Sequence, residues 1–292
     1  MVYALLSVAF WGVLDGGLRV AIVGYGADPY LVSTGNLLLG GLVLWAVGDR
    51  RAARGALRYW ETWAFGGCRY AVGILLAYVS WHFAATEVDF LCQTAAAMLV
   101  LWDAGVQRRW PTLGELALVA LLCGGAAWVG FSQPGLPWWS LPVVGAAALC
   151  YAASVVLAAR NPANQRAVTP AERAGLTGMV LIVCALPFLL AFPFVGPPLD
   201  TVNWASTLGW ALGIGLLTRV PSMGFYLVAA KHLGAKRLVL VFAVMWMVTL
   251  STEWAASMAG VADMRAMLTP TDLAVGVAMT LGSVWMALKR RA

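Results

Sequence analysis

The chain has 292 residues, of which 62% are hydrophobic and only 11% are charged, and its formal net charge is +6. A water-soluble domain carries about a quarter charged residues, so this composition excludes an ordinary soluble protein. The basic residues stand at the ends of apolar segments rather than in a stripe interleaved with aromatic residues, and we therefore expect no nucleic-acid partner.

Apolar blocks of about twenty residues recur along the chain, which is the length needed to cross a hydrocarbon core about 30 Å thick. The backbone in lipid must satisfy its own hydrogen bonds, so the blocks are helices or strands of a closed barrel. Continuous apolar runs such as 116–129 lack the alternation of a barrel strand. We predict an all-α integral membrane protein with ten transmembrane helices. In chain order they cover residues 2–24, 28–48, 63–84, 90–107, 112–131, 140–159, 175–194, 206–229, 238–258 and 271–288.

The lysines and arginines between these helices fall almost entirely on one side of the membrane. If the N-terminus is cytoplasmic, only Arg265 stands outside, whereas the outer loops carry acidic residues such as Asp28, Asp89 and Asp200. Basic loops stay in the cytoplasm, so we predict a multi-pass protein of a cell (inner) membrane with both termini cytoplasmic.

Two short turns indicate an internal repeat. Residues 83–91 join the third and fourth helices and are acidic, and residues 230–238 join the eighth and ninth and are basic. Equivalent turns of opposite charge should face opposite sides, and five helices per half is an odd number, so the second half would be inverted. We predict two inverted five-helix repeats, 1–135 and 136–292, although a chance similarity of two helical hairpins is the alternative. Inverted repeats are typical of transporters, whose binding site lies near the midplane.

Several motifs resemble a known family. Trp11-Gly12, followed by Asp28-Pro29 at the start of the second helix, resembles the beginning of EamA-type members of the drug/metabolite transporter superfamily. The segment 230–240 resembles the turn before the fourth helix of a repeat in that family. Glu253 matches the acidic residue that closes this helix. The resemblance covers nearly the whole chain and implies a five-plus-five inverted-repeat carrier.

The chain also departs from the family pattern. Asn36 stands where the family has an arginine in the second helix, and prolines are missing near Met98 and Val244. Relatives in the family mostly export amino acids or other metabolites, and some move nucleotide sugars or amines. The departures put the family's usual substrate and gating in question for this chain.

Asp15 is the most informative candidate for a substrate site. It lies near the middle of the first helix, one turn from Trp11 and one turn from Arg19, where a carboxylate is costly and normally faces a cavity or a partner. The alternative is an ion pair with Arg19 near the outer interface. Arg219, near the centre of the eighth helix, could bind a substrate carboxylate or pair with Asp15 or Glu253.

Aromatic residues inside the helices could line a central cavity, because aromatic faces attract cations and stack on rings. Any single one could equally face lipid or pack against a neighbour. His82 is a candidate for proton coupling or a hydrogen-bonded wall residue, and Asn36 and Gln93 could instead bond a neighbouring helix. Arg69 is expected to extend to the interface, where Asp103 and Glu115 also lie. The predicted substrate site comprises Trp11, Asp15, Asn36, Tyr78, Trp81, His82, Gln93, Tyr151, Arg219, Tyr226, Trp246 and Glu253.

These features predict a secondary transporter, first of all an exporter of an amino acid or amine, that works by alternating access as a monomer or homodimer. The sequence has no phosphate loop, nucleophile elbow or HExxH pattern, so we expect no enzyme activity, cofactor or metal, and transport driven by a proton or other ion gradient. A flippase-like carrier of a lipid-linked intermediate, or a membrane enzyme or assembly subunit on the same fold, is the alternative. The expected partners are a small molecule and membrane lipid.

Overall fold

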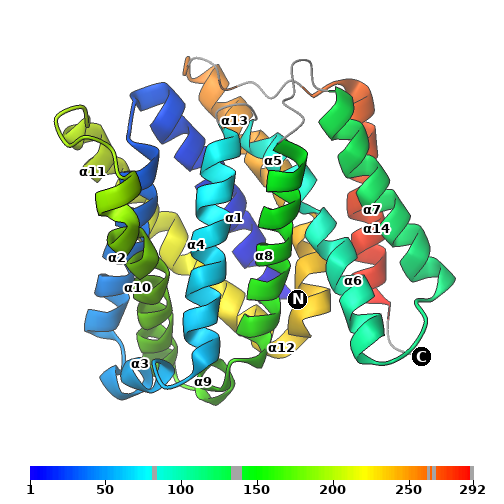
Figure 1. The fold of residues 1–292 in the computed structure, drawn as a ribbon, viewed down its shortest axis with the longest axis horizontal. Helices are drawn as coiled ribbons and strands as arrows, with labels where there is room; N and C mark the ends of the chain where they lie inside the picture. The colour runs from blue at the N-terminus through cyan, green and yellow to red at the C-terminus, as the bar shows by residue number, and fades with distance from the viewer. Residues whose placement is uncertain (81–83, 133–139, 262–263, 265–267, 290–292) are drawn as a thin grey trace.

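The computed structural model describes residues 1–80, 84–132, 140–261, 264 and 268–289, and these residues form helices and no strand (Figure 1). Two stretches are π-helical, and they are labelled η. The elements are α1 (Val2–Arg19), η1 (Val20–Gly24), α2 (Pro29–Val47), α3 (Arg50–Ala56), α4 (Trp60–Ser80), α5 (Ala85–Cys92), α6 (Thr94–Val106), α7 (Leu113–Ser132), α8 (Ser140–Arg160), α9 (Pro162–Arg166), α10 (Pro170–Val195), α11 (Trp204–Ile214), η2 (Gly215–Arg219), α12 (Val220–Phe242), α13 (Met245–Met258) and α14 (Pro270–Leu288).

Eight helical runs in the described part of the chain are long and apolar enough to cross a membrane. Large apolar side chains cover their outer surfaces; Phe131 and Phe194, for example, are 76% and 86% exposed. An exposed apolar surface of this extent fits lipid rather than water. The expectation of an all-α, multi-pass membrane protein is therefore confirmed at this level.

One of these runs is too long for a single crossing. Trp204–Phe242 has 39 residues, about 58 Å of helix, against a hydrocarbon core of about 30 Å. The helix is interrupted at Gly234, whose φ of 72° lies in the left-handed region that favours glycine. The break leaves a short segment, 235–242, which the 14 residues of α13 follow after a further interruption at Ala243 and Val244.

The fourth predicted helix is also divided, and it begins earlier than expected. α5 starts at Ala85 rather than at residue 90, because the Glu87 carboxylate accepts a hydrogen bond from the Ala84 N–H at 2.9 Å and caps the first turn. α5 ends at Cys92, and α6 starts after Gln93. α4 likewise begins at Trp60 rather than at residue 63. Asp89 and Arg69 consequently lie farther inside helices than their predicted positions.

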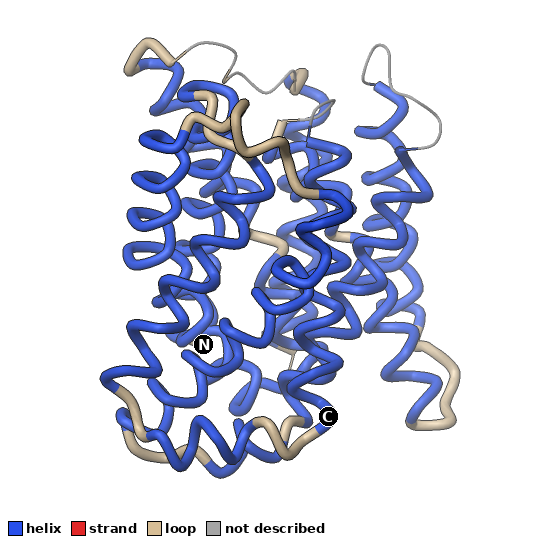
Figure 2. Tube along the Cα trace, turned by 60° about the vertical axis from the view of Figure 1, so that its left-hand side comes forward, coloured by secondary structure: helices blue, strands red, loops and turns tan. Residues whose placement is uncertain are grey.

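The helices pack side by side as a bundle, with connections gathered at its two ends (Figure 2). α2 packs on α10, α4 on α8, α7 on α14, and α1 on both α12 and α13. Glycines allow the closest approach: a Cβ on Gly178 of α10 would lie 2.5 Å from the Trp45 backbone nitrogen of α2. We call the end with α3 and α9 the α3 face; α5 and α13 extend toward the opposite face (Figure 1).

Candidate functional site

Arg69 lies at the centre of the bundle, among aromatic rings. It is the tenth of the 21 residues of α4, so it cannot reach the helix end and stays half-buried. Its guanidinium carbon lies 4.8 Å from the ring centroid of Trp11 on α1, and 5.0 Å from those of Tyr151 on α8 and Tyr226 on α12. Phe65, one turn earlier on α4, lies at 5.4 Å. Contacts of this kind stabilise a cation that has left water.

Arg219 brings a second guanidinium to the same indole. It ends the π-helical turn η2, a type of irregularity that often occurs at functional sites. Its guanidinium carbon lies 4.6 Å from the Trp11 ring centroid, and its Nε donates a 2.9 Å hydrogen bond to Oδ1 of Asn36. The Asn36 amide is fixed in turn by donating to the Val32 carbonyl at 2.9 Å. Arg219 and Asn36 are both buried.

Asp15 is half-buried, and Arg219 and Arg69 are the cations that act most strongly on its carboxylate. None of the ion pairs among the described residues includes Asp15. Arg19, the alternative partner one turn away, lies with its Nε 3.5 Å from Oε1 of the buried Glu253. The charge of Asp15, on α1, therefore interacts with both arginines without a direct ion pair.

Toward the face opposite α3, hydrogen bonds join α5 to α13. Glu253 accepts from the Ala85 N–H at 3.0 Å and from the Thr86 hydroxyl. One turn earlier on α13, the Thr249 hydroxyl donates to Oδ2 of Asp89 at 2.5 Å. The four side chains are buried, so these bonds close the bundle at this end without help from water.

At the α3 face, ion pairs join the segment 235–242 to α6 and α7. Lys236 lies 2.5 Å from the Glu115 carboxylate and 3.2 Å from that of Asp103. Arg109 adds a two-pronged contact to Glu115, with Nη1 and Nη2 at 2.7 and 2.8 Å from its two oxygens. The two divided helices are therefore linked at both ends of the bundle, and the arginine–aromatic cluster lies between the links.

Several buried polar atoms near the bundle centre have no hydrogen-bond partner in the described part of the protein. They are the indole N–H of Trp11, Nε and Nη2 of Arg69, both side-chain polar atoms of Gln93 and the hydroxyl of Tyr151. Gln93 occupies the interruption between α5 and α6 and is 6% exposed. Buried polar groups are nearly always bonded, so this concentration marks the centre as a place where a polar ligand would fit.

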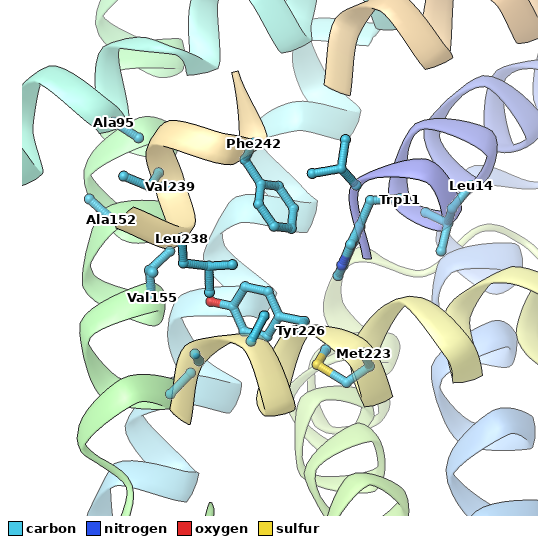
Figure 3. Close-up of a cluster of buried hydrophobic side chains, with 14 of the residues drawn as sticks. Trp11, Leu14, Ala95, Ala152, Val155, Met223, Tyr226, Leu238, Val239 and Phe242 are labelled. Atoms are coloured by element: carbon cyan, nitrogen blue, oxygen red, sulfur yellow. The ribbon is translucent and has the colours of Figure 1, made fainter. Parts of the chain in front are cut away.

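The structure gathers part of the predicted set. In Figure 3 the rings of Trp11, Tyr226 and Phe242 approach one another from α1 and from both parts of α12. Two predicted residues lie elsewhere: Trp246 packs on Phe90 and donates to Thr280, and Glu253 belongs to the α5–α13 link. The backbone of Tyr78 lies in α4, but its side chain and the whole of Trp81 and His82 lie outside the described residues. The residues brought together are Trp11, Asp15, Asn36, Tyr151, Arg219 and Tyr226.

Sequence reasoning missed Arg69 and Asp89. We expected Arg69 to extend to the interface and placed Asp89 in an outer loop, because the predicted third and fourth helices began three and five residues too late. The indication that could have identified Arg69 is the aromatic ring of Phe65, one turn away on the same helical face.

No protein-family model matches the sequence, and no curated protein is significantly similar to it. Among solved structures, the chain is similar to a crystal structure whose title describes it only as a protein. The two chains are 18% identical, the alignment covers 96% of each, and the TM-score is 0.64. This similarity shows that the fold of the whole chain recurs in a solved structure.

Proposed function

We propose that this protein is a secondary transporter, first of all an exporter, of a small metabolite such as an amino acid or amine, related to the EamA-type carriers. The observation that carries the proposal is the central cluster of charged and aromatic side chains between two interrupted helices. Discontinuous helices that meet near the midplane form the binding sites of many transporters. The cluster draws on helices from both halves of the chain.

The packing supports ten helices in two inverted repeats. In this reading the third helix is α4, the fourth is α5 with α6, the eighth runs from α11 to residue 233, and the ninth joins 235–242 to α13. The contact between the first and eighth helices then corresponds to the contact between the sixth and third helices. The contact between the third and seventh helices corresponds to that between the eighth and second helices. The fourth contacts the sixth as the ninth contacts the first. Each contact is reproduced when helix numbers are shifted by five.

Two local features follow the same relation. The fourth and ninth helices both begin with an eight-residue segment before their interruption, α5 in one case and 235–242 in the other. The fifth and tenth helices both start with a threonine and an acidic residue that cap each other's backbone N–H groups: Thr112 with Glu115, and Thr269 with Asp272. These agreements favour two repeats over a chance similarity of two hairpins, although α10 begins with the same kind of cap, Thr169 with Glu172.

The charges in the cluster support a small polar solute. Arg69 and Arg219 offer donors to a carboxylate, whereas Asp15 offers a counter-charge to an ammonium group. The carboxylate of Asp89 interacts with that of Asp15, so negative charge continues from the cluster toward the α5–α13 link. A gradient-driven carrier would open the link at the α3 face and the α5–α13 link in turn, giving each side access to the cluster.

The test is flux through proteoliposomes with a metabolite panel, with and without a pH gradient and in the absence of ATP. We expect Asp15→Asn to insert and melt normally but to slow transport about tenfold or more. Asp200→Asn, which removes an exposed carboxylate from a loop, should be fully active. Transport that requires ATP would exclude a secondary carrier, and full activity of Asp15→Asn would remove Asp15 from the site.

A lipid-linked substrate is the second candidate, and one observation favours it. A largely apolar groove of about 600 Å³ opens beside α11, where a laterally entering lipid could sit. The same vesicles, loaded with a fluorescent short-chain lipid, would show accelerated flip if this reading is right and no effect if the solute carrier is right. The groove is lined by Tyr25, Asn203, Ala205, Ser206, Gly209, Trp210 and Gly213.

A further inference from the structure

Arg69 and Arg219 bring two positive charges to one point of the cluster. Arg69 and Arg219 lie 4.8 and 4.6 Å from the same ring centroid, that of Trp11, so one small group can reach both guanidiniums. The carboxylate of Asp15 interacts with both charges. Glu253 lies instead beside Arg19, 3.5 Å from its Nε. No ion pair among the described residues includes Arg69 or Arg219, so both guanidiniums remain available to an anion.

The hydrogen bonds of the two arginines are also incomplete. Arg219 uses its Nε on Asn36, whereas Nε and Nη2 of Arg69 are buried and have no partner in the described part of the protein. These two nitrogens form one edge of the planar guanidinium, and this edge matches the two oxygens of a carboxylate. The indole N–H of Trp11 and the hydroxyl of Tyr151 are further donors in the same cluster without a partner.

The aromatic rings around Arg69 have a consequence for the ligand. The rings of Trp11, Tyr151 and Tyr226 could have attracted an ammonium group of the substrate. The protein's own guanidiniums lie over these rings instead, and a second cation placed there would meet like charge. The rings thus hold Arg69 in place and favour an anion beside it.

We infer that Arg69 and Arg219, over the indole of Trp11, form a binding subsite for a carboxylate group of the transported solute. The inference rests on the proposed transport function and narrows it, because simple amines without an acid group are excluded. The nearby carboxylate of Asp15 would repel a phosphate dianion more strongly than a carboxylate monoanion. Arg69 is the main ligand, and Asn36 positions Arg219 through the 2.9 Å hydrogen bond.

The experiment measures binding separately from transport. Purified protein in detergent is melted with each natural amino acid, with its decarboxylated amine, with its deaminated acid, and with inorganic phosphate. We expect stabilisation by compounds that keep the carboxylate and none by the matching amine. Arg69→Gln should abolish the shift, and Arg69→Lys should weaken binding about tenfold or more, because lysine keeps the charge but loses the two-pronged edge. Arg54→Gln, at an exposed site on α3, should bind normally.

The outcomes separate the two proposals. If amines bind and cross the bilayer as well as the matching amino acids do, the transporter stands and the carboxylate subsite is wrong. If carboxylates bind through Arg69 but nothing crosses, the subsite stands and the transport function is wrong. Stabilisation by phosphate alone, unchanged affinity in Arg69→Lys, or no binding by any carboxylate overturns the inference. The melting temperature of each ligand-free variant shows whether it has folded.

Discussion

Adding one methyl group at Gly16 should force α1 away from α13. A Cβ at this position would lie 2.8 Å from both Cβ and Cγ2 of Thr252. Thr252 cannot turn away freely, because its hydroxyl donates to the Val248 carbonyl at 2.9 Å. Overpacking of this kind costs about 1–3 kcal/mol, whereas alanine improves a helix interior by about 0.5–1 kcal/mol over glycine. We therefore expect Gly16→Ala to be less stable than the parent by up to about 2.5 kcal/mol.

The neighbouring residue provides a matched control. A Cβ on Gly17 would meet nothing within 4 Å, so Gly17→Ala should keep only the helix-forming gain. The difference between the two variants is the steric cost, and 2 kcal/mol corresponds to about 4–8 °C in a protein of this size. The assay is thermal unfolding of both purified variants in the same detergent, followed by tryptophan fluorescence. Equal melting temperatures, or a Gly16→Ala protein more stable than the parent, would refute the close packing of α1 on α13.

Two further predictions concern the α3 face and the orientation. Glu115→Gln should destabilise the protein by about 1–3 kcal/mol, since it removes three charge-assisted hydrogen bonds from a buried side chain. Asp103 is half-buried and its contacts are longer, so Asp103→Asn should cost less than about 1 kcal/mol. Equal losses of stability in thermal unfolding would contradict the central role of Glu115. Reporter fusions after Arg58 should report the cytoplasm and fusions after Pro198 the outside, and the reverse result would overturn the orientation given by the basic loops.

The helical architecture follows from the sequence because lipid leaves the backbone few choices. Length and hydropathy predict long helices, but they do not locate interruptions. The break at Gly234 falls inside the turn predicted at residues 230–238. The interruptions at Gln93 and at Ala243 and Val244 fall inside apolar runs, so the fourth and ninth helices were predicted as continuous. The repeat boundary at residue 135 lies outside the described residues, and the two-repeat division stays a proposal.

The site was harder to predict than the fold, because its members come from separate helices. Asp15 and Arg219 were identified as isolated charges at membrane depth, which is a signal within one helix. The hydrogen-bond partner of Arg219 is Asn36, which was singled out in the sequence because the resembled family has an arginine at that position. The guanidinium of Arg219 comes from η2, and the amide oxygen of Asn36 accepts its hydrogen bond. Such a pairing between helices cannot be inferred from one sequence.

The division of the site between the halves of the chain limits how the protein can be assembled. Trp11, Asp15 and Arg69 come from residues up to Ser132, whereas Arg219 and Tyr226 come from residues after Ser140. Two copies of the first half, one inverted against the other, would bring two Asp15 carboxylates to the cluster and would lack Tyr226. Two copies of the second half would lack the indole beneath the arginines. The cluster therefore carries an asymmetric set of charges, and a homodimer of either half would not reproduce it.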